Sequence, residues 1–202
     1  MLFLVIYLSQ YQYLVLLTIH ILLVYLLYLI EFQKQAEKQS VGENEYCSTM
    51  RKLFRILYKL EVLKADWPDY AKRAEVTLYG EGQRNYENNR QRFHKDVGLH
   101  SSQYETWSCW LEQLMVYFIF TYFCGAVYDG RIYGKIQMAV ASLFYIEQML
   151  MARFVKNEGH LYEEDIQGIV YRYSREVEHS DENLEKLEKL MEKEVWLCTN
   201  RQ

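Results

Sequence analysis

The sequence predicts an all-α protein: a multi-helix bundle with a central helical hairpin and a long C-terminal amphipathic helix. Apolar residues recur at three- and four-residue spacing in several segments, which is typical of helices that bury one face. The 202-residue chain contains one Pro and 9 Gly, too few turn residues for a many-stranded fold. Half of its residues are hydrophobic (50%), so a chain of this length can bury a sizeable core.

The first segment is an apolar helix over residues 1–31, and no charged residue occurs before Glu31. About 20 apolar residues are enough to cross a bilayer, and Lys34 and Lys38 follow, which would place the body of the protein in the cytoplasm. The segment lacks a basic start and a small-residue cleavage site, so a signal peptide is not expected. Two interpretations therefore stand: a membrane span, with membrane contact through residues 1–30, or a core helix surrounded by other helices.

A polar connector over residues 31–45 marks the most plausible boundary, and residues 46–198 form the predicted helical domain. Its first helix spans 46–64 and carries an apolar stripe opposite several basic residues. A basic amphipathic helix can lie on anionic lipid, but more often such a stripe packs into its own fold. We expect packing here.

The next signals set helix boundaries. Asp66 is expected to cap a helix that has Pro68 in its first turn and ends at Gly80. Residues 81–100 are polar, so any helix there is expected to be short and solvated. Ser102 and the Glu105 that follows fit a capping box, which predicts another helix start.

The central hairpin comes next. Residues 107–128 are almost continuously apolar and aromatic, so this helix is expected at the centre of the domain. Asp129-Gly130 breaks it, and residues 132–156 resume helical periodicity. Gly159 is expected to close the second helix in the left-handed conformation.

The C-terminal unit is predicted to be one long helix, because its apolar stripe keeps its phase from Ile166 to Met191. The alternative is a break, with Ser180 or Asp181 capping a second helix. On a helical wheel Glu176 and Asn183 share one shoulder of the stripe, and Glu178 lies on the other.

Reactive side chains of several kinds crowd together in this unit, between Tyr173 and Asn183. His179 could serve as a general base, with Arg175 and Asn183 one turn away to orient its ring and Glu182 to raise its basicity. The alternative is an ordinary solvated helix face with a surface histidine. No catalytic residue can be assigned from the sequence.

Several classes of site are excluded by pattern. The four cysteines (47, 109, 124 and 198) form no Cys-x-x-Cys pair, and the five histidines form no His-x-x-x-His pair, so no metal site is predicted. Phosphate-binding loops and nucleophile elbows are also missing from the sequence. The net charge of -4 argues against a nucleic-acid partner. Unclustered cysteines suit a reducing cytoplasm.

Two segments carry a family resemblance. The run from Tyr173 to Leu184, YSREVEHSDENL, resembles the YSREIEHSxENL signature of the FliB (flagellin lysine-N-methylase) family. Residues 112–120 with Tyr122-Phe123 are similar to that family's ENLLVYYIFRYF helix, with Gln113 and Thr121 in place of an Asn and an Arg.

The resemblance implies methylation of flagellin lysines in the bacterial cytoplasm, with S-adenosylmethionine as donor. It also implies an iron–sulfur cluster in a cysteine-rich N-terminal half, and this chain has no such cysteine motif. We therefore expect the C-terminal helical portion of such a protein, either as a truncated gene product or as an expressed fragment, and we expect it to be inactive alone. The resemblance makes Arg175, Glu178, His179 and Asn183 the candidate site residues. These four fan out around the helix, so at least one is expected to stabilise packing. The alternative is a non-enzymatic, membrane-anchored helical interaction protein.

Overall fold

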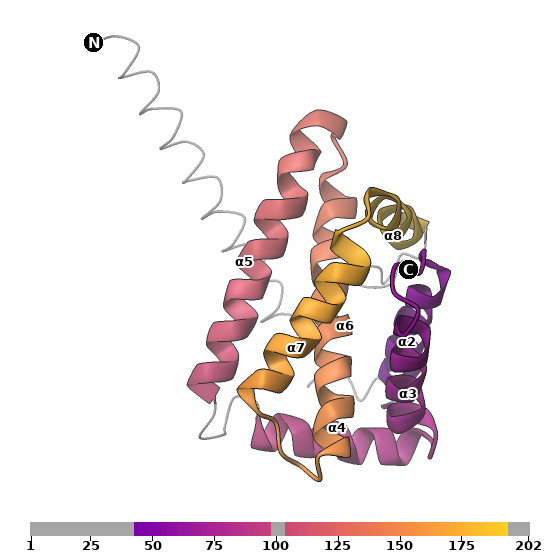
Figure 1. The fold of residues 1–202 in the computed structure, drawn as a ribbon, viewed down its shortest axis with the longest axis vertical. Helices are drawn as coiled ribbons and strands as arrows, with labels where there is room; N and C mark the ends of the chain where they lie inside the picture. Colours follow the sequence, from indigo (N-terminus) through magenta and orange to yellow (C-terminus); the bar gives the residue numbers. More distant parts are fainter. Residues whose placement is uncertain (1–42, 98–103, 194–202) are drawn as a thin grey trace, which may run out of the picture. The chain divides into compact units, whose positions relative to one another are not determined.

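The computed structural model describes residues 43–97 and 104–193. The chain divides into two compact units, Met1–Glu43 and Asn44–Gln202, and all described residues except Glu43 belong to the second. The described residues form helices joined by short loops and contain no strand, which confirms the predicted all-α class (Figure 1). Their elements are α2 (Glu43–Ile56), η1 (Leu57–Lys59), α3 (Trp67–Tyr79), α4 (Gln83–Asp96), α5 (Tyr104–Asp129), α6 (Ile132–Lys156), α7 (Glu163–Tyr173), η2 (Ser174–Glu178) and α8 (Asp181–Lys193).

Two predictions fall on residues without a described position. The apolar segment 1–31 lies outside the described residues, so its two interpretations remain predictions. The same holds for the capping box, because Ser102 is not among the described residues, although α5 begins close behind it at Tyr104.

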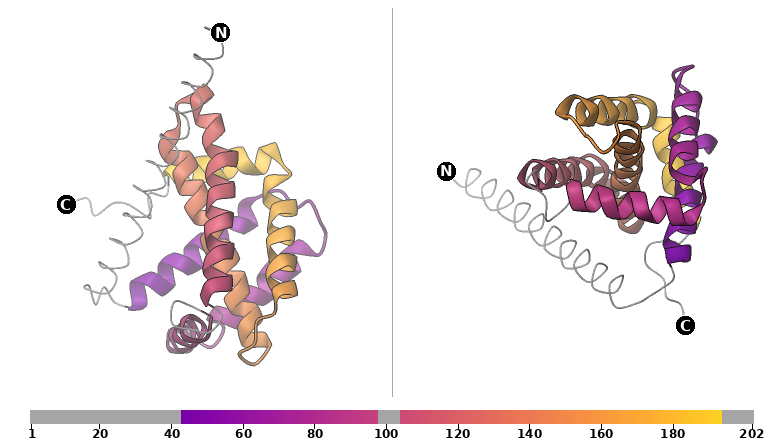
Figure 2. Two further views of the ribbon diagram at one scale, coloured as in Figure 1. Left: turned by 90° about the vertical axis from the view of Figure 1, so that its left-hand side faces the viewer. Right: turned by 90° about the horizontal axis from the view of Figure 1, so that it is seen from below.

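The predicted hairpin is confirmed. Helices α5 and α6 run side by side in opposite directions, as Figures 1 and 2 show, and contact each other along their length. Gly130 connects them with a φ of 71°, a left-handed value that glycine adopts without strain. Asp129 stabilises the turn, because its side chain accepts a hydrogen bond from the backbone N–H of Arg131 at 2.9 Å.

The central helix is α6 and not α5, which corrects the prediction for residues 107–128. Helix α6 contacts α3, α4, α5, α7 and α8, and Tyr145, Ile146 and Leu150 are fully buried on it. Helix α5 covers one side of α6 and leaves Tyr117 and Phe120 about half exposed, at 47% and 48%. Aromatic content made α5 look buried all round, whereas its rings in fact line both a packed face and a solvent-facing one.

Helix α6 also bears on the membrane question. Within the described part of the chain, its segment Gly134–Lys156 is the one stretch long and apolar enough to cross a bilayer, yet 72% of it is buried in the domain. That burial is typical of the core helix of a packed bundle.

Helix α4 corrects the prediction of a short, solvated helix in residues 81–100. It spans 14 residues and crosses one end of the hairpin (Figure 1). Its buried face carries Tyr86, Phe93 and, just beyond the helix, Val97, spaced by seven and four residues. The polar composition of the remaining positions concealed this narrow stripe.

The helices α2 and α3 follow their predictions in packing but not in capping. The apolar stripe of α2 is buried, with Met50 at 1% and Phe54 at 0% exposure, so the expectation of packing is confirmed. Pro68 occupies the first turn of α3 as predicted. Asp66 has a helical backbone conformation and makes no capping hydrogen bond; its carboxylate pairs with Arg172 instead.

The C-terminal unit is broken, which corrects the prediction of one long helix. Helix α7 passes into a π-helical turn, η2, in which the His179 N–H donates to the Ser174 carbonyl five residues back, at 3.2 Å. A new helix, α8, then begins in another direction (Figure 1). The Ser180 side chain caps it by accepting the Asn183 N–H at 3.2 Å, so the capping alternative was the correct one.

Candidate functional site

The signature segment, Tyr173–Asn183, occupies the end of α7, the π turn and the start of α8. Its four predicted site residues, Arg175, Glu178, His179 and Asn183, point in different directions, as the wheel indicated. Turns of π-helix are often found at functional sites, because the extra residue per turn redirects neighbouring side chains.

Asn183 is a packing residue. It is fully buried, and its Oδ1 accepts the backbone N–H of Glu61 at 2.6 Å. Its Nδ2 donates to the carbonyl of Glu61 at 3.0 Å and to the carbonyl of Glu176 at 2.8 Å. Both polar ends of the amide are thus used to join the loop after η1 to the π turn.

Glu176, in the adjacent π turn, binds the same loop. It was not among the candidate residues predicted from the sequence. Its side chain is 1% exposed, and Oε2 accepts the backbone N–H groups of Leu63 and Lys64 at 3.2 and 3.1 Å. A carboxylate that accepts two backbone N–H groups replaces the hydrogen bonds that it loses on burial. Glu176 and Asn183 lie on the same side of the apolar stripe on the helical wheel, and this shared position could have predicted a shared role for Glu176.

Arg175 belongs to a surface network beside that loop. Its Nη2 lies 3.3 Å from Glu176 Oε1 and 3.9 Å from Asp66 Oδ1, and its guanidinium lies 5.8 Å from the ring of Tyr171. A hydrogen bond from Arg172 holds the pKa of Asp66 below its usual value. Arg175 therefore joins the π turn to the start of α3.

His179 is exposed, and its ring does not have the partners that the sequence suggested. Nδ1 lies 3.1 Å from the Ser174 carbonyl, so the ring closes the π turn. The amide of Asn183 is engaged elsewhere and does not orient the imidazole. A general-base role for His179 stays a prediction.

Glu178 lies on the opposite shoulder and faces a groove. Its Oε1 lies 3.3 Å from the hydroxyl of Tyr122 on α5. The groove, here the α5–α7 groove, has a volume of about 380 Å³ and is lined mainly by apolar and aromatic groups. The lining residues come from α5, α7 and η2: Trp110, Leu114, Tyr117, Phe118, Gln167, Val170, Tyr171, Ser174 and Glu178.

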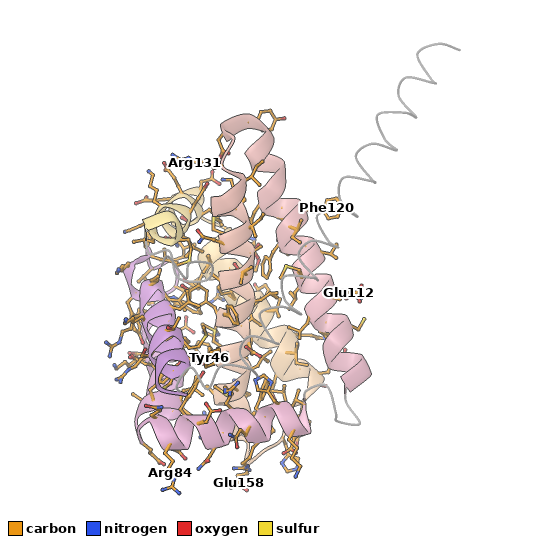
Figure 3. The ribbon with its side chains drawn as sticks, turned by 180° about the vertical axis from the view of Figure 1, so that it is seen from behind. Tyr46, Arg84, Glu112, Phe120, Arg131 and Glu158 are labelled. Carbon is orange, nitrogen blue, oxygen red and sulfur yellow. The ribbon has the colours of Figure 1, made fainter. Side chains whose placement is uncertain are left out.

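The two family-like segments of the sequence meet at this groove. Tyr117 and Phe118 belong to the first segment, while Ser174 and Glu178 belong to the second. Behind the groove, the rings of Phe118 and Tyr173 are in contact edge to face, with centroids 6.2 Å apart. Figure 3 shows that Glu112 and Phe120, also in the first segment, point away from the hairpin.

The electrostatics of the groove favour a cation. Desolvation and the negative charge of Glu178 raise the pKa of Tyr117. Among the described residues, the ion pairs that Lys and Arg form all involve acids other than Glu178. An acid beside aromatic rings attracts an ammonium group through both its charge and the ring quadrupoles.

The iron–sulfur cluster implied by the family resemblance has no ligand set among the described residues. No group of three or more His, Cys, Asp or Glu side chains comes together among residues 43–97 and 104–193. Cys47 is buried on α2 and Cys109 is exposed on α5, and both are free thiols. The methyl donor, S-adenosylmethionine, stays a prediction.

Comparisons with known proteins identify the family. Neither the curated proteins nor the solved structures gave a match. The model of the FliB lysine N-methylase C-terminal domain matches residues 9–198, which covers nearly all of the 202-residue chain and both family-like segments. The chain therefore belongs to the FliB lysine N-methylase family and corresponds to the C-terminal domain of that family.

Proposed function

We propose that this chain provides the substrate-lysine site of a flagellin lysine N-methylase, and that the α5–α7 groove receives the lysine side chain. The observation that carries the proposal is the Glu178 carboxylate, which opens onto an aromatic-lined groove without a cationic partner among the described residues. Lysine combines a long apolar stem with a terminal ammonium. Its stem matches the groove walls and its charge matches Glu178.

The energetics agree with a site that selects a cation. A hydrogen bond to a charged group contributes about 1.5–3 kcal/mol, and a neighbouring aromatic ring adds about 0.5–1 kcal/mol at a solvent-accessible site. Glu178 is half-buried, so solvent screening places the ion pair near the lower end of that range. An affinity difference of about tenfold between a lysine and a neutral side chain of equal length follows.

The methyl donor belongs to the proposal only at the level of the family. S-adenosylmethionine would supply an electrophilic methyl group, and the described residues hold no ligand cluster for an iron–sulfur centre. We propose that other residues of the enzyme hold these groups. This domain then contributes recognition of the substrate, and we expect no methyl transfer from the domain alone.

Flagellin in the bacterial cytoplasm is the proposed substrate, because the family resemblance implies both the protein and its location before export. Nucleic acid has no place in this proposal. Membrane contact through residues 1–30 remains a prediction outside the described residues.

The test measures binding of purified monomeric flagellin to the full 202-residue chain by biolayer interferometry. Glu178→Gln should weaken binding by about tenfold, since the amide keeps the size of the carboxylate and removes its charge. Glu182→Gln is the matched control, because Glu182 is exposed on α8.

A second measurement addresses the reaction. In cells that carry the complete enzyme, mass spectrometry should find much less N-methyl-lysine on flagellin after Glu178→Gln than after Glu182→Gln. Equal flagellin binding and equal methylation in the two variants would overturn the proposal. That result would favour the alternative of a non-enzymatic interaction protein.

A further inference from the structure

A chain of buried hydroxyl groups leads from the groove carboxylate into the core. Tyr122, Ser142 and Tyr173 come from α5, α6 and α7, and their exposures are 4%, 0% and 0%. The Tyr122 hydroxyl lies 3.3 Å from Glu178 Oε1 and 3.4 Å from Ser142 Oγ. Three helices thus place one donor behind Glu178, on the side away from the open groove.

The number of protons fixes the direction of these bonds. Each hydroxyl has a single proton to donate. The Tyr173 hydroxyl donates to Ser142 Oγ at 2.9 Å, and Ser142 Oγ donates to the carbonyl of Met138 at 2.8 Å. Ser142 therefore has no proton left for Tyr122, so Tyr122 is the donor in its own contacts. A carboxylate is a stronger acceptor than a hydroxyl, so this proton is directed to Glu178.

The ring of Tyr122 is held in place by its neighbours. It stacks on Phe118, with centroids 5.6 Å apart and an interplanar angle of 16°. Phe118 is itself 1% exposed and contacts Tyr173 edge to face. The hydroxyl has little freedom to leave Glu178, because a fully packed ring cannot change rotamer without opening the core.

We propose that Tyr122 is a positioning residue for the groove: its hydroxyl, which also faces Ser142, holds the Glu178 carboxylate in one orientation toward the groove. The proposal rests on the proposed function, since it concerns how the lysine site holds its carboxylate. A group that is ordered before binding loses less conformational freedom when the ligand binds. The groove therefore binds a cation more tightly than it would with a freely rotating carboxylate.

The other polar groups around Glu178 are neutral or are directed elsewhere. Tyr117 and Tyr122 face it from α5 and Tyr173 from α7, and burial raises the pKa of all three phenols, so they stay neutral below pH 8. On its own turn, Arg175 is directed to Glu176 and His179 to the Ser174 carbonyl. From α6 the neighbouring group is the hydroxyl of Ser142, which does not titrate.

The experiment follows binding of Nα-acetyl-lysine amide to the full chain by NMR chemical-shift titration at pH 7. Nα-acetyl-norleucine amide, which lacks the ammonium, gives the background. Tyr122→Phe removes the donor and keeps the ring. It should weaken lysine binding about two- to tenfold and leave norleucine binding unchanged, because the lost hydrogen bond orients the carboxylate that the ammonium contacts.

Tyr86→Phe is the matched control. Tyr86 is a fully buried tyrosine on α4 that donates to Gln148 at 3.1 Å, away from the groove. It should lower stability by a similar amount and leave lysine binding unchanged. If Tyr122→Phe folds poorly, 3-fluorotyrosine at position 122 replaces it. Its more acidic hydroxyl is a stronger donor and should strengthen lysine binding without changing norleucine binding.

The outcomes separate the two proposals. Unchanged lysine binding in the Tyr122 variants, with binding lost in Glu178→Gln, would overturn the positioning role and leave the lysine site standing. Equal binding of the lysine amide by Glu178→Gln and the unmodified chain would overturn both. A loss of lysine binding in Glu178→Gln and Tyr122→Phe that Tyr86→Phe does not share supports both.

Discussion

Replacing Asn183 by alanine should destabilise the domain more than any exposed substitution, and its cost can be worked from the structure. The change removes three hydrogen bonds, to the N–H and carbonyl of Glu61 and to the carbonyl of Glu176. A buried polar group that loses its partner costs about 1–3 kcal/mol. Glu61 is exposed, so water can replace part of its loss, whereas Glu176 is buried. We expect a total of about 2–4 kcal/mol.

Urea denaturation followed by circular dichroism measures this loss. With a slope of about 1–3 kcal/mol per molar urea, the midpoint of unfolding should fall by about 1–2 M. Asn88→Ala, at an exposed position of α4, should change the free energy of unfolding by less than about 0.5 kcal/mol. Asn183→Asp can still accept the Glu61 N–H but cannot donate to either carbonyl, so it should also be strongly destabilising. A loss below about 1 kcal/mol for Asn183→Ala would refute the assignment of Asn183 as a packing residue.

Two further predictions concern the same domain. Ser180→Ala removes the cap of α8 and should cost about 1 kcal/mol, with faster amide hydrogen exchange in the first turn of α8 and unchanged exchange in α6; equal exchange in both proteins would contradict the capping role. Burial acts to raise the pKa of Glu75, but hydrogen bonds from Lys72, Arg55 and Tyr58 outweigh it and leave the pKa below 4.5. A lowered pKa stabilises the fold above the unfolded value and this contribution is lost as pH falls through the folded value, so the destabilisation caused by Glu75→Gln should be largest near pH 7 and shrink toward pH 3. A pH-independent difference in urea midpoints would show that the charge of Glu75 contributes nothing.

Periodicity predicted the fold where a helix has an apolar stripe and a breaker at its end. Asp129-Gly130 and the regular spacing after Ile132 were enough to predict the hairpin. Periodicity did not predict α4 correctly, because part of the buried face of this helix is polar. Glu87 and Asn89 are buried close to Tyr86 in the sequence. Buried tyrosines also pack against polar residues: Tyr79 donates a hydrogen bond to Gln148 at 2.8 Å. A buried glutamine adds nothing to the apolar pattern from which a buried helix face is predicted.

The break after η2 was hidden for a different reason. An apolar stripe that keeps its phase is normally evidence for one helix. Here the buried positions on both sides of the break, Tyr173, Val177, Leu187 and Met191, face a common core although α8 has a new direction. The sequence indicated the break only locally, through a possible helix cap at Ser180, three residues before Asn183. Tertiary packing then decides that Ser180 acts as this cap.

The helical wheel nevertheless separated the two residues of the signature segment that hold the loop from the one that faces the groove. Residues seven apart share a helix face, and Glu176 and Asn183 do hold the same loop. Glu178, on the other shoulder, faces the groove. The helical wheel could not predict which groups these residues contact. Asn183 binds a loop more than a hundred residues earlier in the sequence, and Glu178 binds Tyr122 of α5.

This division has a consequence for mutations in the signature segment. Substitutions at Glu176 or Asn183 act on the loop and lower stability. Glu178 instead accepts a hydrogen bond from Tyr122, interacts with Tyr117 and leaves one side of its carboxylate toward the groove. Because the loop holds the π turn and the start of α8 in place, Glu178 keeps its position without an oppositely charged partner among the described residues. A groove carboxylate with no internal cation is what a lysine-binding site requires, since an internal arginine would have to be displaced each time substrate entered.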